Sequence, residues 1–195
     1  MIEVEIKLAV ADSVAIRTKL LKLGFVENRK IEEHDIYFDN EKGTVREAGC
    51  ALRVRETKDL YSKRVSAQIN FKGKKLDSQT MTRQELETGV ENADVCRRIL
   101  EEIGYNPVIP KVVKIRQMLQ KDKVTACLDQ VQDLGDFLEL EILVETEEKR
   151  EEALGRIEDI LKQLGYSIRD TLQTSYLSML QKKAGKGKKY GIQTF

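Results

Sequence analysis

The sequence contains little of the chemistry on which several common enzyme classes depend. Its 195 residues include no Trp, only one His, and three widely spaced Cys without a CxxC pair. Zinc sites built from Cys and His, and catalytic Cys-His pairs, need more of these side chains at suitable spacing. A Gly-rich phosphate loop of the GxxxxGK type is also missing, so a phosphate would have to be held by side chains. An odd number of scattered Cys is typical of a reducing, cytoplasmic compartment.

Long apolar segments and an excess of one charge are missing as well. No apolar run approaches the ~18 residues of a membrane-spanning helix, and the chain begins with strand-like alternation rather than an apolar signal sequence. Charged residues make up 34% of the chain, yet the net charge is only +1, which argues against a general affinity for nucleic acid. We therefore expect a cytoplasmic protein without nucleic-acid or membrane partners.

The domain organisation follows from the scarcity of linkers. Only two Pro occur, Pro107 and Pro110, and no long polar segment divides the chain. We expect one domain over 1–184 and a basic, mobile tail over 185–195, for which solvation is a simpler interpretation than contact with nucleic acid or an anionic membrane. Alternation and capping patterns predict strands at 2–9, 25–39, 50–57, 64–73, 80–88, 111–120, 123–132 and 136–145, and helices at 12–24, 92–104, 147–164 and 171–183.

One pattern occurs three times: a strand with two glutamates one residue apart, followed by a helix that ends in Gly and an aromatic residue. Residues i and i+2 of a strand share a face, so each pair places two carboxylates side by side. Such crowding costs free energy unless a cation or a basic group compensates it. The pairs are Glu3 and Glu5, Glu85 and Glu87, and Glu139 and Glu141.

The parity of the charged residues indicates where the polar faces of the strands point. On an ordinary half-exposed sheet these faces would meet solvent. Here they consist almost entirely of charged residues, acids and bases are segregated by strand, and the predicted helices carry apolar stripes that could cover the other face. We therefore predict an α+β fold, in which a closed eight-stranded antiparallel barrel has a charged lumen and about four helices pack outside it.

A lumen with both signs of charge suits a polyanion bound together with a metal ion. Mg²⁺ and Mn²⁺ prefer carboxylate oxygens together with substrate phosphates, whereas phosphate chains are bound by Arg and Lys. The acidic candidates are Glu3, Glu5, Asp129, Glu139 and Glu141. The basic candidates are Lys7, Arg53, Arg55, Lys72, Arg83, Lys114 and Arg116.

These residues carry a resemblance to a known family. The opening Glu3-x-Glu5-x-Lys7 is similar to the ExExK signature of the CYTH superfamily, the triphosphate tunnel metalloenzymes, which include class IV adenylyl cyclases and thiamine triphosphatases. The similarity covers roughly residues 1–181. It continues through Asp35-x-Tyr37-Phe38-Asp39, Leu52-Arg53-Val54-Arg55, Phe71-Lys72-Gly73, Arg83-x-Glu85-x-Glu87, Lys114-x-Arg116, Leu128-Asp129-x-Val131, Leu134-Gly135-x-Phe137-x-Glu139-x-Glu141 and Ser175-Tyr176.

The resemblance implies a tunnel that binds a small-molecule triphosphate with Mg²⁺ or Mn²⁺. It implies that Glu85 and Glu87 orient basic residues, and it leaves a homodimer open because dimers are common in the family. The implied metal ligands are Glu3, Glu5, Asp129, Glu139 and Glu141. The implied triphosphate-binding residues are Lys7, Arg53, Arg55, Lys72, Arg83, Lys114 and Arg116. The implied catalytic residues are Glu5, Lys7, Asp129 and Glu141.

The reaction is less closely defined by the sequence. The compact chain resembles the class IV adenylyl cyclase branch, which converts ATP to cyclic AMP and pyrophosphate, although the His-Phe element that usually precedes ExExK in the bacterial members is not present. A triphosphatase acting on thiamine triphosphate, a nucleoside triphosphate or inorganic triphosphate is the alternative. Against it, the chain has neither the Trp of animal thiamine triphosphatases nor the extra helical domain of long inorganic triphosphatases. A non-catalytic module that binds a phosphorylated ligand is a further alternative.

Overall fold

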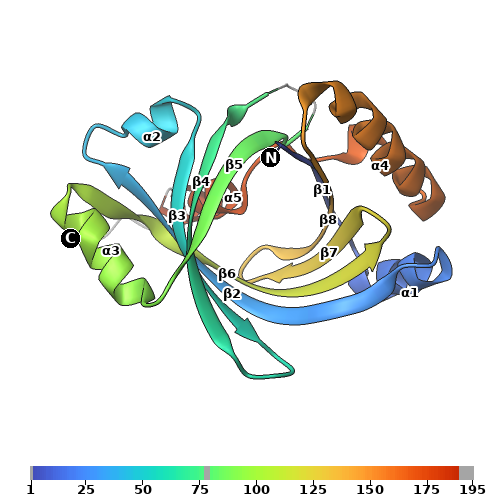
Figure 1. Ribbon diagram of the computed structural model, residues 1–195, viewed down its shortest axis with the longest axis horizontal. Helices are drawn as coiled ribbons and strands as arrows, with labels where there is room; N and C mark the ends of the chain where they lie inside the picture. The colour runs from blue at the N-terminus through green and yellow to red at the C-terminus, as the bar shows by residue number, and fades with distance from the viewer. Residues whose placement is uncertain (1, 77–79, 189–195) are drawn as a thin grey trace.

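The protein folds as a closed antiparallel barrel with helices packed around it (Figure 1), and the start of the last helix, at Tyr176, lines the cavity inside the barrel. A computed structural model describes residues 2–76 and 80–188. The strands follow one another around the barrel in the order β1-β5-β4-β3-β2-β6-β7-β8, which confirms the predicted architecture. Their bounds are β1 (Ile2–Ala9), β2 (Val26–Asn40), β3 (Ala51–Asp59), β4 (Val65–Lys75), β5 (Arg83–Val90), β6 (Tyr105–Lys121), β7 (Val124–Val131) and β8 (Gly135–Val144).

Five α-helices accompany the barrel in the described part of the chain, where about four were expected. They are α1 (Ser13–Lys22), α2 (Thr44–Glu47), α3 (Ala93–Glu102), α4 (Arg150–Leu164) and α5 (Tyr176–Lys188). The additional one, α2, is a single turn that the sequence pattern did not predict. The last helix begins at Tyr176 instead of near 171: a separate 3₁₀ turn covers Ile168–Asp170, and residues 171–175 between the two are irregular. It continues past the predicted boundary at 184, and the end of the predicted tail, 189–195, lies outside the described residues.

The repeated strand-helix pattern has a common local geometry. Asp12 caps α1, the helix that follows β1: its carboxylate accepts a hydrogen bond from the Ala15 amide at 2.9 Å, and Asn92 caps α3 in the same way. Helices α1, α3 and α4 each end near a glycine with a left-handed backbone, a conformation that an L side chain would strain. These residues are Gly24, Gly104 and Gly165, with φ near 90°.

One strand begins earlier than the sequence predicts. The pattern predicted a strand over 111–120, but β6 starts at Tyr105 and includes Pro107 and Pro110. The pairing of β6 with β2 changes register between Asp35 and Tyr37, and Pro107 pairs with Phe38 beyond that irregularity. Proline is tolerated at such interruptions because fewer ladder hydrogen bonds depend on its missing N–H.

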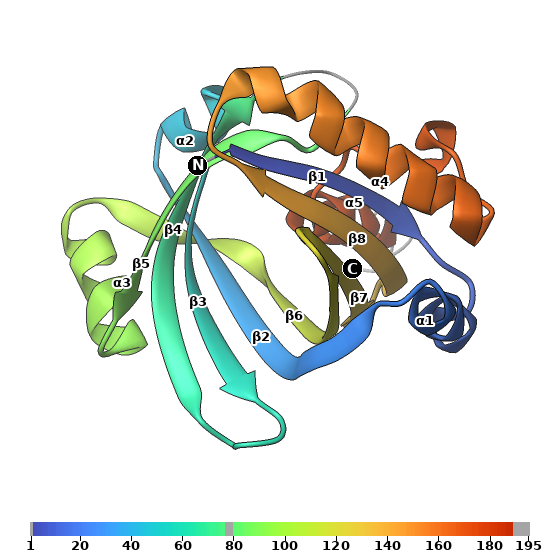
Figure 2. The same cartoon turned by 45° about the vertical axis from the view of Figure 1, so that its right-hand side comes forward.

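The main apolar core lies outside the barrel wall. In β1, Val4, Ile6 and Leu8 point outward and are almost completely buried, while the alternate residues of the strand enter the lumen. Figure 2 shows α4 lying along the outer side of β1 and β8, where Ile157 and Leu161 join this core. No helix of the described residues is long and apolar enough to cross a membrane.

The outer core makes a testable contribution to stability. Leu161 is fully buried, so we expect Leu161→Ala to lower the free energy of unfolding by about 2–5 kcal/mol through lost burial and the cavity that remains. Val14→Ala is the control, because Val14 on α1 is 68% exposed and should change stability by less than about 0.5 kcal/mol. Urea unfolding followed by circular dichroism measures both. Equal losses of unfolding free energy for Leu161→Ala and Val14→Ala would contradict the assignment of Leu161 to an apolar core between α4 and the outer side of the wall.

Candidate metal and phosphate site

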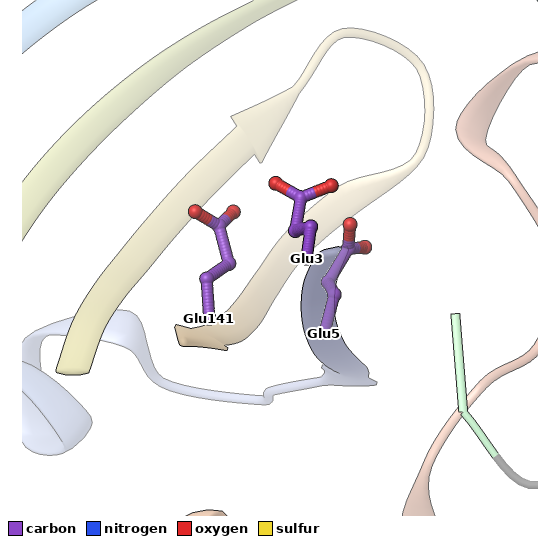
Figure 3. Close-up of side chains that lie close together, drawn as sticks. All are labelled: Glu3, Glu5 and Glu141. Atoms are coloured by element: carbon purple, nitrogen blue, oxygen red, sulfur yellow. The ribbon is translucent and has the colours of Figure 1, made fainter. Parts of the chain in front are cut away.

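Three carboxylates converge inside the barrel. Glu3 and Glu5 alternate along β1, and Glu141 lies directly opposite Glu5 on the antiparallel neighbour β8. Each offers an oxygen, and these oxygens lie within 4.8 Å of one another. Figure 3 shows the three side chains rising from the two strands toward a shared space. We call Glu3, Glu5 and Glu141 the acidic triad.

The electrostatics of the triad favour a bound cation. Burial raises the pKa of Glu5, and the neighbouring carboxylate of Glu139 raises it further. Burial also raises the pKa of Glu141 to about 8, since the attraction of Arg116 is too weak to offset burial and the nearby acids. Negative charge on these groups is therefore incompletely compensated by the protein itself.

The base nearest the triad is Lys72 on β4. Its Nζ atom lies 2.7 Å from Glu3, 3.1 Å from Glu85 and 3.8 Å from Glu5. Burial opposes the charged ammonium, but these carboxylates outweigh it and raise the Lys72 pKa above its usual value. Glu85 is 3.7 Å from Arg53 as well, so its placement agrees with the expected role of orienting bases.

Two of the predicted metal ligands lie elsewhere in the charge network. Asp129 accepts two hydrogen bonds from the Arg116 guanidinium, both at 2.6 Å. Glu139 is paired with the same guanidinium and with Lys7, whose Nζ is 3.1 Å away. Burial works against the charged form of Glu139, but Lys7 and Arg116 hold its pKa well below the usual value. Both acids thus bond closely to Arg116. Among the triad carboxylates, Glu3 is paired with Lys72 and Glu141 lies 3.4 Å from Arg116, a looser contact.

A second group of ion pairs connects β2 with β3 and β6. Asp35 accepts hydrogen bonds from Arg55 at 2.6 and 2.7 Å, and Glu33 lies 2.8 Å from Arg55 and 3.1 Å from Lys114. Burial acts to raise the pKa of Glu33, but the charges of Lys114, Arg55 and Arg116 bring it down to about 2. Arg53 contacts Asp35 more loosely, at 3.4 Å.

Three other residues singled out in the sequence lie apart from this network. The Arg83 guanidinium donates to the carbonyl oxygens of Gly49 at 3.1 Å and Gly73 at 3.2 Å. Glu87 accepts hydrogen bonds from two side-chain amides rather than from a base. The single His, His34, forms a hydrogen bond of 2.8 Å with Glu32.

Sequence reasoning did not select two residues that the structure brings into the site. Glu33 lies two positions before Asp35 on the same face of β2, so strand parity could have identified it. Tyr176, noted only as part of a terminal motif, contacts Lys7, Lys114 and Asp129 from α5. These partners are distant in the sequence, and only the folded chain reveals the contact.

A cavity of about 770 Å³ connects these groups inside the barrel. Its wall includes the acidic triad, the bases of β1, β3, β4 and β6, and the start of α5. The volume falls within the range of small-molecule sites. One ligand in this space could therefore touch carboxylates on one side and guanidinium or ammonium groups on the other.

The triad fits a divalent cation of the Mg²⁺ or Mn²⁺ type. It supplies three oxygen donors from two adjacent strands, and burial together with the neighbouring acids raises the pKa of Glu5 and of Glu141, so that a cation would favour their charged forms. Lys72 lies at the edge of the triad and supplies part of that charge in the protein alone.

The raised pKa of Glu141 predicts a pH-dependent effect on stability. Above about pH 5 the unfolded carboxyl loses its proton, whereas burial keeps the folded one protonated up to about pH 8, so stability falls over this interval. Glu141→Gln removes this titration. We measure the unfolding temperatures of the variant and the wild type in EDTA. We expect the variant's advantage in unfolding temperature to be larger at pH 8 than at pH 5. Glu152→Gln, on the exposed side of α4, is the matched control, and a difference independent of pH would contradict the assignment.

Comparison with known proteins agrees with this geometry. The CYTH domain family matches residues 1–176. A protein of Methanocaldococcus jannaschii described as a "putative adenylate cyclase" is 34% identical over 179 residues, covering 92% of this chain and 98% of the relative. A solved structure from Pyrococcus horikoshii OT3 has a TM-score of 0.83 at 32% identity, covering 93% of this chain and 99% of its own.

A more distant solved structure shares the fold. A Hippeastrum protein, described as a "putative adenylyl cyclase" that reveals a dominant triphosphatase activity, has a TM-score of 0.67 at 17% identity, covering 93% of this chain and 95% of its own. The family match and the M. jannaschii relative each extend over most of the sequence, in agreement with the resemblance carried by the strand motifs. The chain belongs to the CYTH domain family.

Proposed function

We propose that the protein is a divalent-metal-dependent enzyme that converts ATP to cyclic AMP and pyrophosphate. Members of the CYTH family are adenylyl cyclase-like or triphosphatase enzymes, and the tunnel enzymes of the family use divalent metals. The observation that carries the proposal is the acidic triad facing Lys72 and Arg53 within one cavity. An anion-binding module would have no use for three converging carboxylates.

The residues divide into two proposed roles. Glu3, Glu5 and Glu141 hold Mg²⁺ or Mn²⁺, which when bound supplies positive charge against the negative charge that builds on the phosphates. The phosphate oxygens are bound by the bases that line the cavity, in charge-assisted hydrogen bonds. We assign this second role to Lys7, Arg53, Arg55, Lys72, Lys114 and Arg116.

The ion pairs of Arg55 and Arg116 with carboxylates prepare these bases for binding a triphosphate. Asp129 and Glu139 hold Arg116, and Glu33 and Asp35 hold Arg55, so these bases are oriented before a ligand arrives. A triphosphate gains attraction to guanidinium groups whose positions are already fixed, which reduces the entropy lost on binding. We therefore assign Asp129 and Glu139 to orienting Arg116 rather than to the metal.

The cyclase reaction is favoured by the similarity to the M. jannaschii relative, which covers almost all of that protein. In this reaction the ribose 3′-oxygen forms a bond to the α-phosphorus. The bond from that phosphorus to the bridging oxygen breaks, pyrophosphate leaves with the electron pair, and the hydroxyl proton passes to water. The lysines and arginines of the cavity would hold the phosphates in line for this displacement.

Product analysis tests the reaction. The protein incubated with ATP and Mn²⁺ should yield cyclic AMP and pyrophosphate in equal amounts, resolved by chromatography. Orthophosphate without cyclic AMP, from ATP, thiamine triphosphate or tripolyphosphate, would contradict the cyclase assignment and support a triphosphatase, the activity described for the Hippeastrum protein. If none of the three compounds is turned over, the proposal that the protein is an enzyme acting on triphosphates is contradicted.

Arg53 provides a test of the phosphate-binding role. Its nearest carboxylate contacts are 3.4 and 3.7 Å, so its removal should disturb the network less than removal of Arg55 would. We expect Arg53→Ala to raise KM for the triphosphate by about 10-fold or more, the size expected for a lost charge-assisted hydrogen bond. Arg17→Ala, at an exposed ion pair with Glu27, is the control for losing an arginine. An unchanged KM in a folded Arg53→Ala variant would exclude Arg53 from the site.

A further inference from the structure

We propose that Tyr176 is a positioning residue whose aromatic ring holds the ammonium groups of Lys7 and Lys114 for phosphate binding. The inference rests on the proposed function, because it assumes that these lysines bind a triphosphate. It assigns to α5 a direct electrostatic part in the site. A residue that only filled space could be replaced by any apolar side chain of similar size.

The geometry places both lysines over one ring. Lys7 Nζ lies 4.2 Å from the centroid of the Tyr176 ring, and Lys114 Nζ lies 5.3 Å from it. Both distances fall within the range in which a cation is attracted by the negative face of an aromatic ring. The two lysines come from β1 and β6, so a residue on α5 joins side chains from separate parts of the wall.

The ring itself is held from two sides. Phe137 meets it edge-on, with the ring centroids 5.0 Å apart and the ring planes at 62°. The Tyr176 hydroxyl donates a hydrogen bond of 3.0 Å to Asp129 Oδ2, and Asp129 is fixed in turn by Arg116. Tyr176 is only 6% exposed, so its contacts with the two ammonium groups are shielded from bulk water. Cation–π attraction is stronger in such a desolvated setting.

The segment before α5 is joined to the same strand as Lys7. The Leu172 amide donates to the Lys7 carbonyl oxygen at 2.6 Å, and Lys75 Nζ donates to the Gln173 carbonyl oxygen at 2.6 Å. The backbone therefore sets the position of Tyr176 relative to Lys7. A ring held in this way can define where the ammonium lies.

The Tyr176 ring can hold the lysine ammonium groups without neutralising their charge, which the carboxylate partners cannot do. Lys7 also lies 3.1 Å from Glu139, and Lys114 lies 3.1 Å from Glu33, but each of these carboxylates cancels the charge that a phosphate would sense. An aromatic face attracts a cation without carrying net charge. Tyr176 can thus keep both ammonium groups in place while they exchange a carboxylate for a phosphate.

A fluorination series tests the proposal with little change in side-chain size. Tyr176→Phe retains the ring and sets the reference, and phenylalanines with one, two and three ring fluorines at position 176 progressively weaken the negative face. Isothermal titration with tripolyphosphate and Mg²⁺ should show affinity falling stepwise with fluorine number, by about threefold to thirtyfold over the series. Tyr176→Leu should bind more weakly than Tyr176→Phe.

The same fluorinated residues at Phe25 provide the control. Phe25 is buried in the core outside the wall, so substitution there tests for effects of fluorine on packing and should leave affinity unchanged. Equal affinities along the series at position 176, or equal losses at both positions, would overturn the positioning role even though the wild type binds. A wild type that binds no tripolyphosphate would overturn the proposed function together with this inference.

Discussion

The structure depends on the requirement that charges buried in the barrel be compensated. The outer face of the wall is covered by apolar side chains and helices, so the alternate residues of each strand must face inward. Charged groups withdrawn from water are costly unless they are paired and hydrogen-bonded. Most inward charges meet this requirement through opposite charges on neighbouring strands, as Asp35 and Arg55 do. Glu5 and Glu141 meet it incompletely, which singles out their surroundings as the place for a cation.

The acids of the tunnel consequently serve two different purposes. Glu3, Glu5 and Glu141 bring carboxylate oxygens within 4.8 Å of one another, and Glu141 contacts Arg116 only loosely at 3.4 Å, whereas Asp129 and Glu139 bond Arg116 closely. In the proposed function, the same type of side chain thus builds a cation site on one part of the wall and orients bases on another. On this proposal the bases are preorganised without being permanently neutralised, because a bound triphosphate would replace their carboxylate contacts with phosphate oxygens. A ring such as that of Tyr176 contributes to this arrangement by attracting cations without adding charge.

Much of this arrangement was predictable from strand parity. The Glu-x-Glu pairs and the charged faces correctly indicated a closed barrel with a charged lumen, because a period of two fixes which residues share a face. Parity does not define which strands are neighbours, so it could not show that Glu141 lies opposite Glu5. It also gave no reason to separate Arg83, which bonds backbone carbonyls, from the other bases. The contact between Tyr176 and Lys7 joins opposite ends of the chain, and local sequence patterns carry no information about it.

The central claim is that the triad of Glu3, Glu5 and Glu141 holds the metal in the presence of a triphosphate. Anomalous diffraction from crystals soaked with Mn²⁺ and tripolyphosphate locates the metal directly. The account predicts an anomalous peak within coordinating distance of all three carboxylates, with the phosphates extending from it toward the bases of β3 and β4. A peak coordinated by Asp129 and Glu139, with Arg116 displaced, would contradict the division of roles between the acids. Bound tripolyphosphate with no metal at the triad would contradict the claim entirely.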